Sequence, residues 1–201
     1  MKTNKFMLGT KGRMTQIFDE DGSAHAATVV MAGPLTVTQV KESEKDGYSA
    51  AQVGFDAMKE SRVKKPQAGK PFRHLREFDP GEGKAELGGT IDISIFVPGD
   101  VVAVSAVSKG KGFQGVVKRH GFHGGPRSHG QKNKERAPGS IGGGGRAGGR
   151  VVKGMRMAGR MGGDRITVRN LKILQVDPST NTLVISGAIP GRPGTLVEIR
   201  G

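Results

Sequence analysis

One segment of this chain, residues 109–163, carries nearly all of its charge imbalance. It holds six lysines and seven arginines against a single acid, Glu135, so its charge is +12, whereas the whole chain of 201 residues carries +14. The same segment holds 18 of the 34 glycines. With so little apolar surface it cannot offset the entropy of ordering its backbone by burying a core of its own. We therefore expect it to require a polyanionic partner, and nucleic acid is the leading candidate.

The rest of the chain is close to neutral, with 19 basic and 17 acidic residues over 146 positions, and is long enough for one domain with a core. The absence of cysteine excludes disulfides and thiolate metal sites. No apolar run approaches the roughly 18 residues of a membrane span, and the N-terminus has no signal-peptide pattern. We expect a cytoplasmic protein that has no membrane partner.

Outside the basic segment, short runs of β-forming residues alternate with turn signals. The run at residues 90–96 places Ile91, Ile93 and Ile95 on one face, which is the period of a half-buried strand. Many short strands at such spacing, without a long amphipathic helix, favour an antiparallel barrel or sandwich over βαβ units. The predicted strands cover residues 14–18, 27–31, 36–40, 48–55, 90–96, 101–107, 165–168, 171–176, 182–186 and 196–199.

The strands on either side of the basic segment must pack together. We therefore predict one globular β-barrel domain formed by residues 1–108 and 164–201, with a loop-rich excursion at about residues 61–87. Residues 109–163 then form a Gly/Arg/Lys-rich extension that loops out of this domain. Such a long loop is uncommon in a compact domain unless function or disorder lies behind it, so a solvated loop without a partner is the alternative.

Two glycine-rich motifs in the extension are typical of phosphate sites but lack the necessary context. Residues 110–115 (GKGFQG) match G-x-G-x-x-G, yet further glycines follow at Gly121 and Gly124, where a dinucleotide site requires a helix of a βαβ unit. Residues 142–149 (GGGGRAGG) lack the Gly-Lys-Ser/Thr of a P-loop. No nucleophile is paired with a base and an orienting acid. We predict no catalytic residue, no cofactor and no small-molecule substrate.

The aromatic and imidazole side chains of the extension fit RNA better than metal. His120, His123 and His129 lie among glycines that would not hold a rigid site, so we predict no metal centre. Histidines near RNA stack or donate to phosphate. Phe113 and Phe122 fit two roles equally well, either stacking on bases or anchoring the base of the loop to the barrel.

The cations of the extension are predicted to contact phosphates, and its glycines let the backbone approach RNA closely. Near its end, methionines alternate with Arg156 and Arg160. This pattern favours an extended segment over a helix, with the methionines filling apolar gaps and the arginines facing RNA. The predicted RNA-binding residues are Lys109, Lys111, Lys118, Arg119, His120, His123, Arg127, His129, Lys132, Lys134, Arg136, Arg146, Arg150, Lys153, Arg156 and Arg160.

Motifs along nearly the whole chain share one resemblance. They are LGTKGRMTQIF (8–18), SKGKGF (108–113), VKRHGF (117–122), SHG (128–130), RAPGSIG (136–142), KGMRMAGRMG (153–162) and GAIPG (187–191). In this order they resemble the bacterial large-subunit ribosomal protein of the L-three family. The chain departs from that pattern at residues 143–149, where GGGRAGG replaces a glutamine-containing stretch, so the modification that some relatives carry on that glutamine is not expected.

The resemblance implies a barrel of the type shared with translation factors, docked on large-subunit ribosomal RNA beside neighbouring large-subunit ribosomal proteins. It also implies that the extension reaches toward the peptidyl transferase centre, that the protein helps to nucleate subunit assembly, and that it is not an enzyme. Two other classes remain as alternatives from the residues alone. One is a regulatory nucleic-acid binder acting on DNA, although no recognition-helix pattern is present; the other is a phosphate-handling enzyme that uses the GKGFQG loop.

Overall fold

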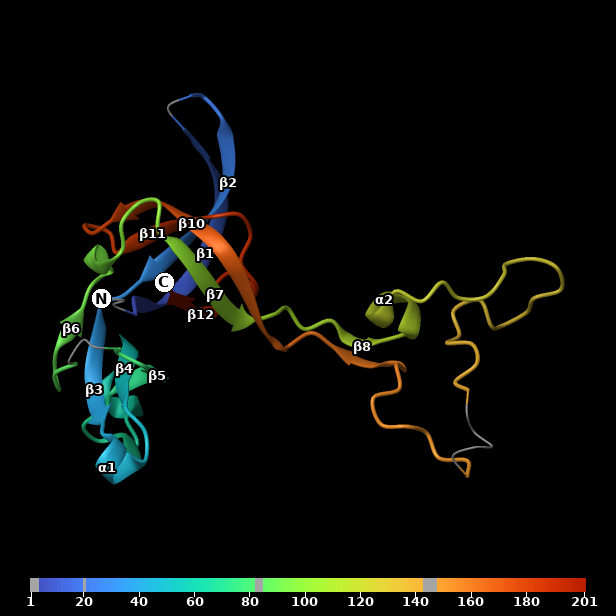
Figure 1. Ribbon diagram of the computed structural model, residues 1–201, viewed down its shortest axis with the longest axis horizontal. Helices are drawn as coiled ribbons and strands as arrows, with labels where there is room; N and C mark the ends of the chain where they lie inside the picture. Colours follow the sequence, from blue (N-terminus) through green and yellow to red (C-terminus); the bar gives the residue numbers. More distant parts are fainter. Residues whose placement is uncertain (1–3, 20, 82–84, 143–147) are drawn as a thin grey trace. The chain divides into compact units, whose positions relative to one another are not determined.

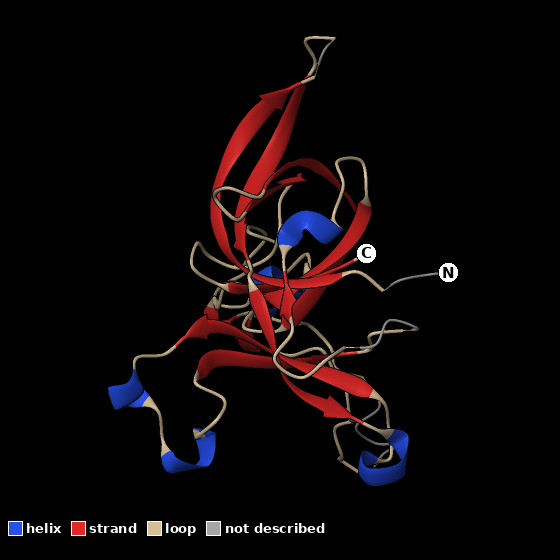
Figure 2. Cartoon of the chain, turned by 90° about the vertical axis from the view of Figure 1, so that its left-hand side faces the viewer, coloured by secondary structure: helices blue, strands red, loops and turns tan. Residues whose placement is uncertain are grey.

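The computed structural model shows a chain made mainly of strands, with a few short helices (Figure 2). It describes residues 4–19, 21–81, 85–142 and 148–201. The chain divides into two compact units, one formed by Met1–Ser108 with Arg165–Gly201 and the other by Lys109–Asp164. No helix among the described residues is long and apolar enough to span a membrane.

The first unit is built on a closed antiparallel barrel of six strands (Figure 1). Closure pairs the backbone of each strand on both sides and leaves no open sheet edge. In order around the barrel, the strands are β1 (Phe6–Phe18), β12 (Leu196–Arg200), β7 (Val101–Val107), β10 (Arg165–Asp177), β11 (Thr182–Ser186) and β2 (Ala24–Ala32). The prediction of a mainly β fold with an antiparallel barrel is confirmed.

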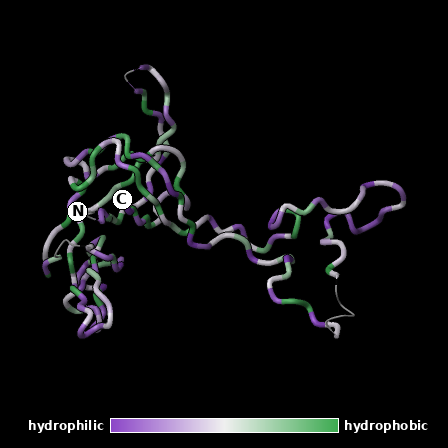
Figure 3. The backbone as a smooth tube through the Cα atoms, viewed as in Figure 1, coloured by the Kyte–Doolittle hydropathy of each residue, from purple (hydrophilic) through white to green (hydrophobic). Residues whose placement is uncertain are grey.

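Alternation of side chains along the strands builds the barrel core. On β7, Val102, Val104 and Ala106 are buried, whereas Val101 and Val107 are exposed. Buried aliphatic side chains from the other strands join the same core cluster, and the hydrophobic colouring of these strands is visible in Figure 3. Burial of this apolar surface is the main term that stabilises the unit.

The same unit contains a second, four-stranded antiparallel sheet. In spatial order its strands are β5 (Phe72–Phe78), β4 (Ala50–Ala57), β3 (Leu35–Lys41) and β6 (Thr90–Ile91), with the one-turn helix α1 (Ser43–Asp46) between β3 and β4. The ring of Phe6 on β1 stacks on that of Phe78 on β5, with centroids 4.4 Å apart and planes inclined by 9°. This aromatic pair joins the core of the barrel to that of the second sheet.

The stretch predicted as a loop-rich excursion, residues 61–87, contains strand β5, so the prediction was wrong there. Pro71 and Pro80 lie outside β5, so neither removes a donor from its ladder with β4. Among its described residues, the excursion is irregular only on the two sides of this strand. Before β5 lie the 3-10 helices η1 (Glu60–Arg62) and η2 (Lys65–Gln67).

The strand predicted at residues 90–96 was also wrong over most of its length. Only Thr90 and Ile91 pair, opposite β3, and the 3-10 helix η3 (Ile93–Ile95) follows. Ile93 is nevertheless buried, with 1% of its surface exposed. The alternating isoleucines therefore indicated burial correctly, but a single 3-10 turn also buries such a pattern.

The two strands predicted at residues 165–168 and 171–176 form one strand, β10. Its register against β7 shifts between Val168 and Leu171, and Asn170 has a φ of 58°. Asparagine tolerates this left-handed backbone better than most residues do. The polar interruption between the two apolar runs is therefore a bulge within one strand rather than a turn between two.

The second unit has little regular structure in its described part. A short antiparallel ribbon pairs β8 (Gly112–Gln114) with β9 (Gly159–Met161), and α2 (Val116–His120) follows β8. The extended segment predicted near the end of the extension is thus confirmed for Arg160 and Met161, which lie on β9. Met155 and Met157 lie outside any strand.

Candidate RNA-binding surface

The β8–β9 ribbon arranges the first cations of the extension. Phe113 lies opposite Arg160, and the Lys111 N–H donates to the Met161 carbonyl oxygen at 2.9 Å. Phe113 is 77% exposed, which supports a stacking role for its ring rather than an anchoring role. The Lys111 and Arg160 side chains are exposed beside it, so the ribbon presents an aromatic face together with two cations.

Helix α2 contacts a later segment of the extension, and we call this contact region the node. It ends where Gly121 adopts a φ of 72°, a left-handed conformation that favours glycine. Arg119 Nη1 donates to the Met157 carbonyl oxygen at 2.7 Å, and His120 Nε2 lies 3.0 Å from the same oxygen. These two predicted RNA-binding side chains are half-buried and contact the protein itself. They therefore hold the node together.

An aromatic and cationic group surrounds the same node. The Arg156 guanidinium lies 5.2 Å from the centroid of the Phe122 ring, and the His120 ring lies 5.9 Å from it on a tilted plane. Phe122 thus packs against residues of the extension, and the Arg156 side chain is exposed. Stacking on Phe122 restricts the guanidinium, which reduces the side-chain entropy that Arg156 would lose on binding a phosphate.

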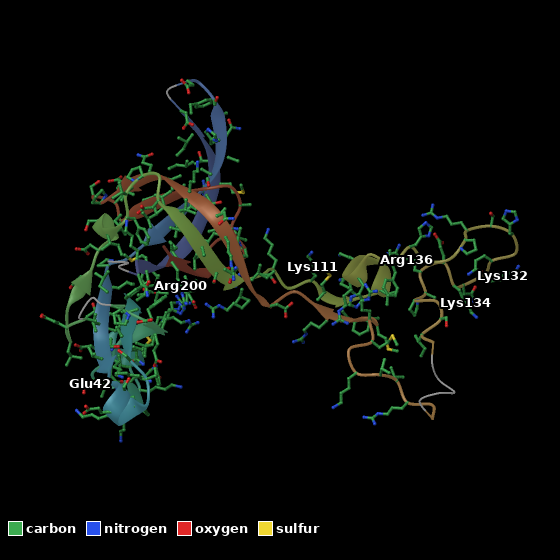
Figure 4. All side chains as sticks on the ribbon, in the orientation of Figure 1. Glu42, Lys111, Lys132, Lys134, Arg136 and Arg200 are labelled. Carbon is green, nitrogen blue, oxygen red and sulfur yellow. The ribbon has the colours of Figure 1, made fainter. Side chains whose placement is uncertain are left out.

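Most of the predicted cations are exposed and have no acidic partner in the part of the chain that the structure describes. Among the described residues of the extension, only Arg127 forms an ion pair, from Nε to Glu135 Oε1 at 2.7 Å, and both side chains remain largely exposed. Lys132, Lys134 and Arg136 lie close together along the extension (Figure 4). The exposed predicted residues are Lys109, Lys111, Lys118, His123, Arg127, His129, Lys132, Lys134, Arg136, Arg150, Lys153, Arg156 and Arg160. Arg146, with residues 143–147, lies outside the described residues.

Two glycines allow close backbone approaches that sequence reasoning did not identify. A Cβ at Gly124 would lie 2.2 Å from the Glu135 carbonyl oxygen, and one at Gly162 would lie 2.1 Å from the Lys109 carbonyl oxygen. Both positions have positive φ, of 83° and 75°. Only glycine fits there. The high glycine content was the available signal, although it could not say which glycines are structural.

A hollow of about 740 Å³ opens beside the first of these approaches. Its lining includes His123, Gly125, Gln131 and Lys134. Glycines on its wall leave the backbone accessible, and Lys134 supplies positive charge. These are the features by which a protein accommodates the sugar–phosphate backbone of a nucleic acid.

The geometry does not match the alternative chemistries. Strand β8, within the GKGFQG motif, pairs with an antiparallel strand, and the helix after it has five residues, whereas a dinucleotide site is built on a parallel βαβ unit. Among the described residues, no group of three or more His, Asp or Glu side chains is placed to hold a metal ion. Here His120 contacts Met157, while His123 and His129 are exposed.

Comparison with known proteins gives one consistent result. Residues 84–200 match the family model described as Ribosomal protein L3. A large ribosomal subunit protein uL3 from Acidothermus cellulolyticus is 49% identical over 207 residues, covering 99% of this chain and 93% of the relative. The uL3 proteins of Thermosynechococcus vestitus and Herpetosiphon aurantiacus are 48% and 46% identical, each covering 96% of this chain and 94% of the relative.

Proposed function

Since this chain belongs to the ribosomal protein L3 family, we propose that it is a structural, non-enzymatic component of the large ribosomal subunit and binds large-subunit ribosomal RNA. Its relatives carry the name of a large ribosomal subunit protein and match it over almost their whole length. We extend the proposal to a cytoplasmic location, to contacts with neighbouring large-subunit ribosomal proteins, and to a role in nucleating subunit assembly.

The observation that carries the proposal is the charge of the extension. Apart from Arg119, its described cations are exposed, and all but Arg127 lack an acidic partner among the residues that the structure describes. Unpaired cations at this density repel one another unless a polyanion neutralises them. Ribosomal RNA supplies phosphates at the density and over the length that such a segment requires.

In the binding mode that we propose, the globular unit sets the orientation on folded RNA while residues 109–163 pass between RNA helices and neutralise phosphates. The two regions would act as separate domains, with residues 1–108 and 164–201 forming the globular one. The exposed cations bind phosphates directly. Arg119 and His120 shape the node that presents them, and Arg146 adds a further cation. The family resemblance supports an extension that reaches toward the peptidyl transferase centre.

Sedimentation of a cell lysate tests this function. The protein should migrate with the large ribosomal subunit at low salt and remain with it at moderate salt, as an integral component does. If the protein instead migrates as a free small protein in both conditions, the ribosomal assignment is wrong, and the extension must serve a different polyanion.

A further inference from the structure

A second group of exposed cations lies in the first unit, within the connection between β4 and β5. Lys59, Arg62, Lys64 and Lys65 fall within seven residues of one another, and all four side chains are exposed. None of them forms an ion pair with a residue that the structure describes. We name these four residues the loop cluster.

Some other cations of the same unit do have acidic partners. Lys41 Nζ lies 2.9 Å from Glu77 Oε1, and Arg76 Nε lies 2.9 Å from Glu198 Oε1. Glu60 is the single acid of residues 58–71, and no ion pair within the described ranges links it to the loop cluster. The near-neutral charge of this unit therefore conceals a local excess of positive charge.

The backbone that carries the loop cluster is held by its own hydrogen bonds. The N–H of Met58 donates to the carbonyl oxygen of Pro71 at 2.8 Å and closes the loop where β4 and β5 begin to pair. Within the loop, Arg62 N–H donates to the Lys59 carbonyl oxygen at 2.9 Å and Gln67 N–H donates to that of Lys64 at 2.8 Å, closing the turns of η1 and η2. The cluster is thus presented on a preformed backbone.

A fifth cation fixes the end of the loop to the sheet. Lys70 Nζ donates to Gln39 Oε1 at 2.6 Å and to Gln52 Oε1 at 2.8 Å, on strands β3 and β4. Lys70 is therefore half-buried and committed to the protein. Because the loop is already ordered, its binding would cost less conformational entropy than ordering a free segment.

We propose that the loop cluster is a second phosphate-binding site, through which the globular unit contacts the RNA backbone independently of the extension. This inference rests on the proposed function. Residues 58–71 contain no aromatic side chain to stack on a base, so the site would recognise phosphates rather than sequence. A second anchor of this kind fixes the orientation of the globular unit, which a single extended segment does not.

The test compares two full-length variants that lose the same number of charges. The loop variant is K59Q/R62Q/K64Q/K65Q, and the matched control, R13Q/R169Q/K172Q/R192Q, removes four exposed cations scattered over the barrel. The probe is a large-subunit ribosomal RNA transcript, and the measurement is the slope of log K against log salt. At about 0.7 to 0.9 per phosphate contact, the loop variant should be shallower than the wild type by about 3, and the control by less than about 1.

Thermal unfolding of both variants shows whether they fold, and both midpoints should match the wild type because the loop is held by backbone bonds. A loop variant with the wild-type slope would overturn the inference and leave the cluster to solvent or to an acidic protein. Equal decreases in slope for both variants would overturn it as well, since charge anywhere on the unit would then suffice. A wild-type chain that does not prefer the transcript to duplex DNA at matched salt would instead contradict the proposed function.

Discussion

The barrel unit and the extension are stabilised in opposite ways. Among the described residues, Val116 is the only buried hydrophobic side chain between Lys109 and Asp164, and every other one belongs to the first unit. The extension instead exposes cations, and residues 109–163 have a net charge of +12. A unit that buries apolar surface can offset its own ordering entropy, whereas one that exposes charge depends on an external ligand. Substitutions in the barrel unit should therefore change mainly the free energy of unfolding, whereas substitutions in the extension should change mainly the affinity for RNA.

Removal of the extension should produce the largest effect, and on binding alone. Arg165 pairs with Val107 in the barrel ladder, so a short glycine-containing turn can join Ser108 to Arg165 in place of residues 109–164. Because about ten phosphates would no longer be neutralised, affinity for a large-subunit RNA transcript should fall at least about 1,000-fold at moderate salt. Gel-shift titration measures the affinity, and circular dichroism should still show a cooperative β unit. Loss of the fold on deletion would contradict the comparison, because the barrel unit would then depend on the extension for its stability.

A cavity in the barrel should act on stability instead. The Leu8 side chain is fully buried, so Leu8→Ala should lower the free energy of unfolding by about 3 kcal/mol. Leu87 is 73% exposed, and Leu87→Ala as a matched control should change it by less than about 0.5 kcal/mol. Urea denaturation measures both. Equal effects of the two substitutions would contradict the assignment of the core.

A buried lysine of the barrel should contribute to stability, in contrast to the exposed cations that are proposed to bind RNA. Lys11 Nζ donates to the carbonyl oxygens of Ile189 at 2.6 Å and Gly191 at 2.9 Å. Lys11→Met leaves these carbonyls without that donor and should cost about 2 kcal/mol of unfolding free energy. Lys172 is exposed, and Lys172→Met should cost less than about 0.5 kcal/mol in the same assay. A neutral Lys11→Met would mean that this amine is dispensable to the fold.

The acid response of the barrel unit should depend on Asp100. The hydrogen bond from Lys5 Nζ at 2.6 Å, aided by the N–H of Val97, holds the pKa of the Asp100 carboxyl below its ordinary value of 3.8. A depressed pKa stabilises the fold above the unfolded-state value, and that contribution is lost as pH falls through the folded-state value. Asp100→Asn should therefore lower stability at neutral pH but not in acid. Urea denaturation at several pH values checks this, and a deficit that persists in acid would contradict it.

A single exposed cation of the extension should have the smallest effect. Lys153→Gln removes one of many unpaired charges, so affinity for the transcript should fall only about fivefold and the slope of log K against log salt by about 0.9. Unfolding free energy should not change. A decrease of about 100-fold or more would reveal a specific contact at Lys153 in place of a shared one.

The parts of the barrel that could be predicted from sequence are those with local signals. Strands β7 and β11 match their predicted residues because short runs rich in β-branched apolar residues are bounded there by clear turns. Strand β5 was not predicted because prolines flank it on both sides. The 3-10 helix η3 was predicted as a strand because a short apolar pattern does not distinguish a 3-10 turn from a strand. Their assignment depends on pairing with distant strands.

The candidate RNA-binding surface likewise has features that the local sequence predicts and features that it does not. Exposure of the cations follows from composition, since a segment with so few apolar residues cannot bury them. The bond from Arg119 to Met157 joins residues 38 positions apart, and no local pattern indicates it. The loop cluster does not show in the net charge of the unit, because acids elsewhere in the unit cancel its local excess of positive charge.

The central claim is that the extension, rather than the barrel, supplies most of the RNA affinity through phosphate neutralisation. The most direct test is the salt dependence of binding to a large-subunit RNA transcript, for the full chain and for the chain without residues 109–164. The slopes of log K against log salt should differ by about 7 to 9, as expected for about ten phosphate contacts in the extension. A difference of about 2 or less would contradict the account, because the extension would then be largely free of RNA.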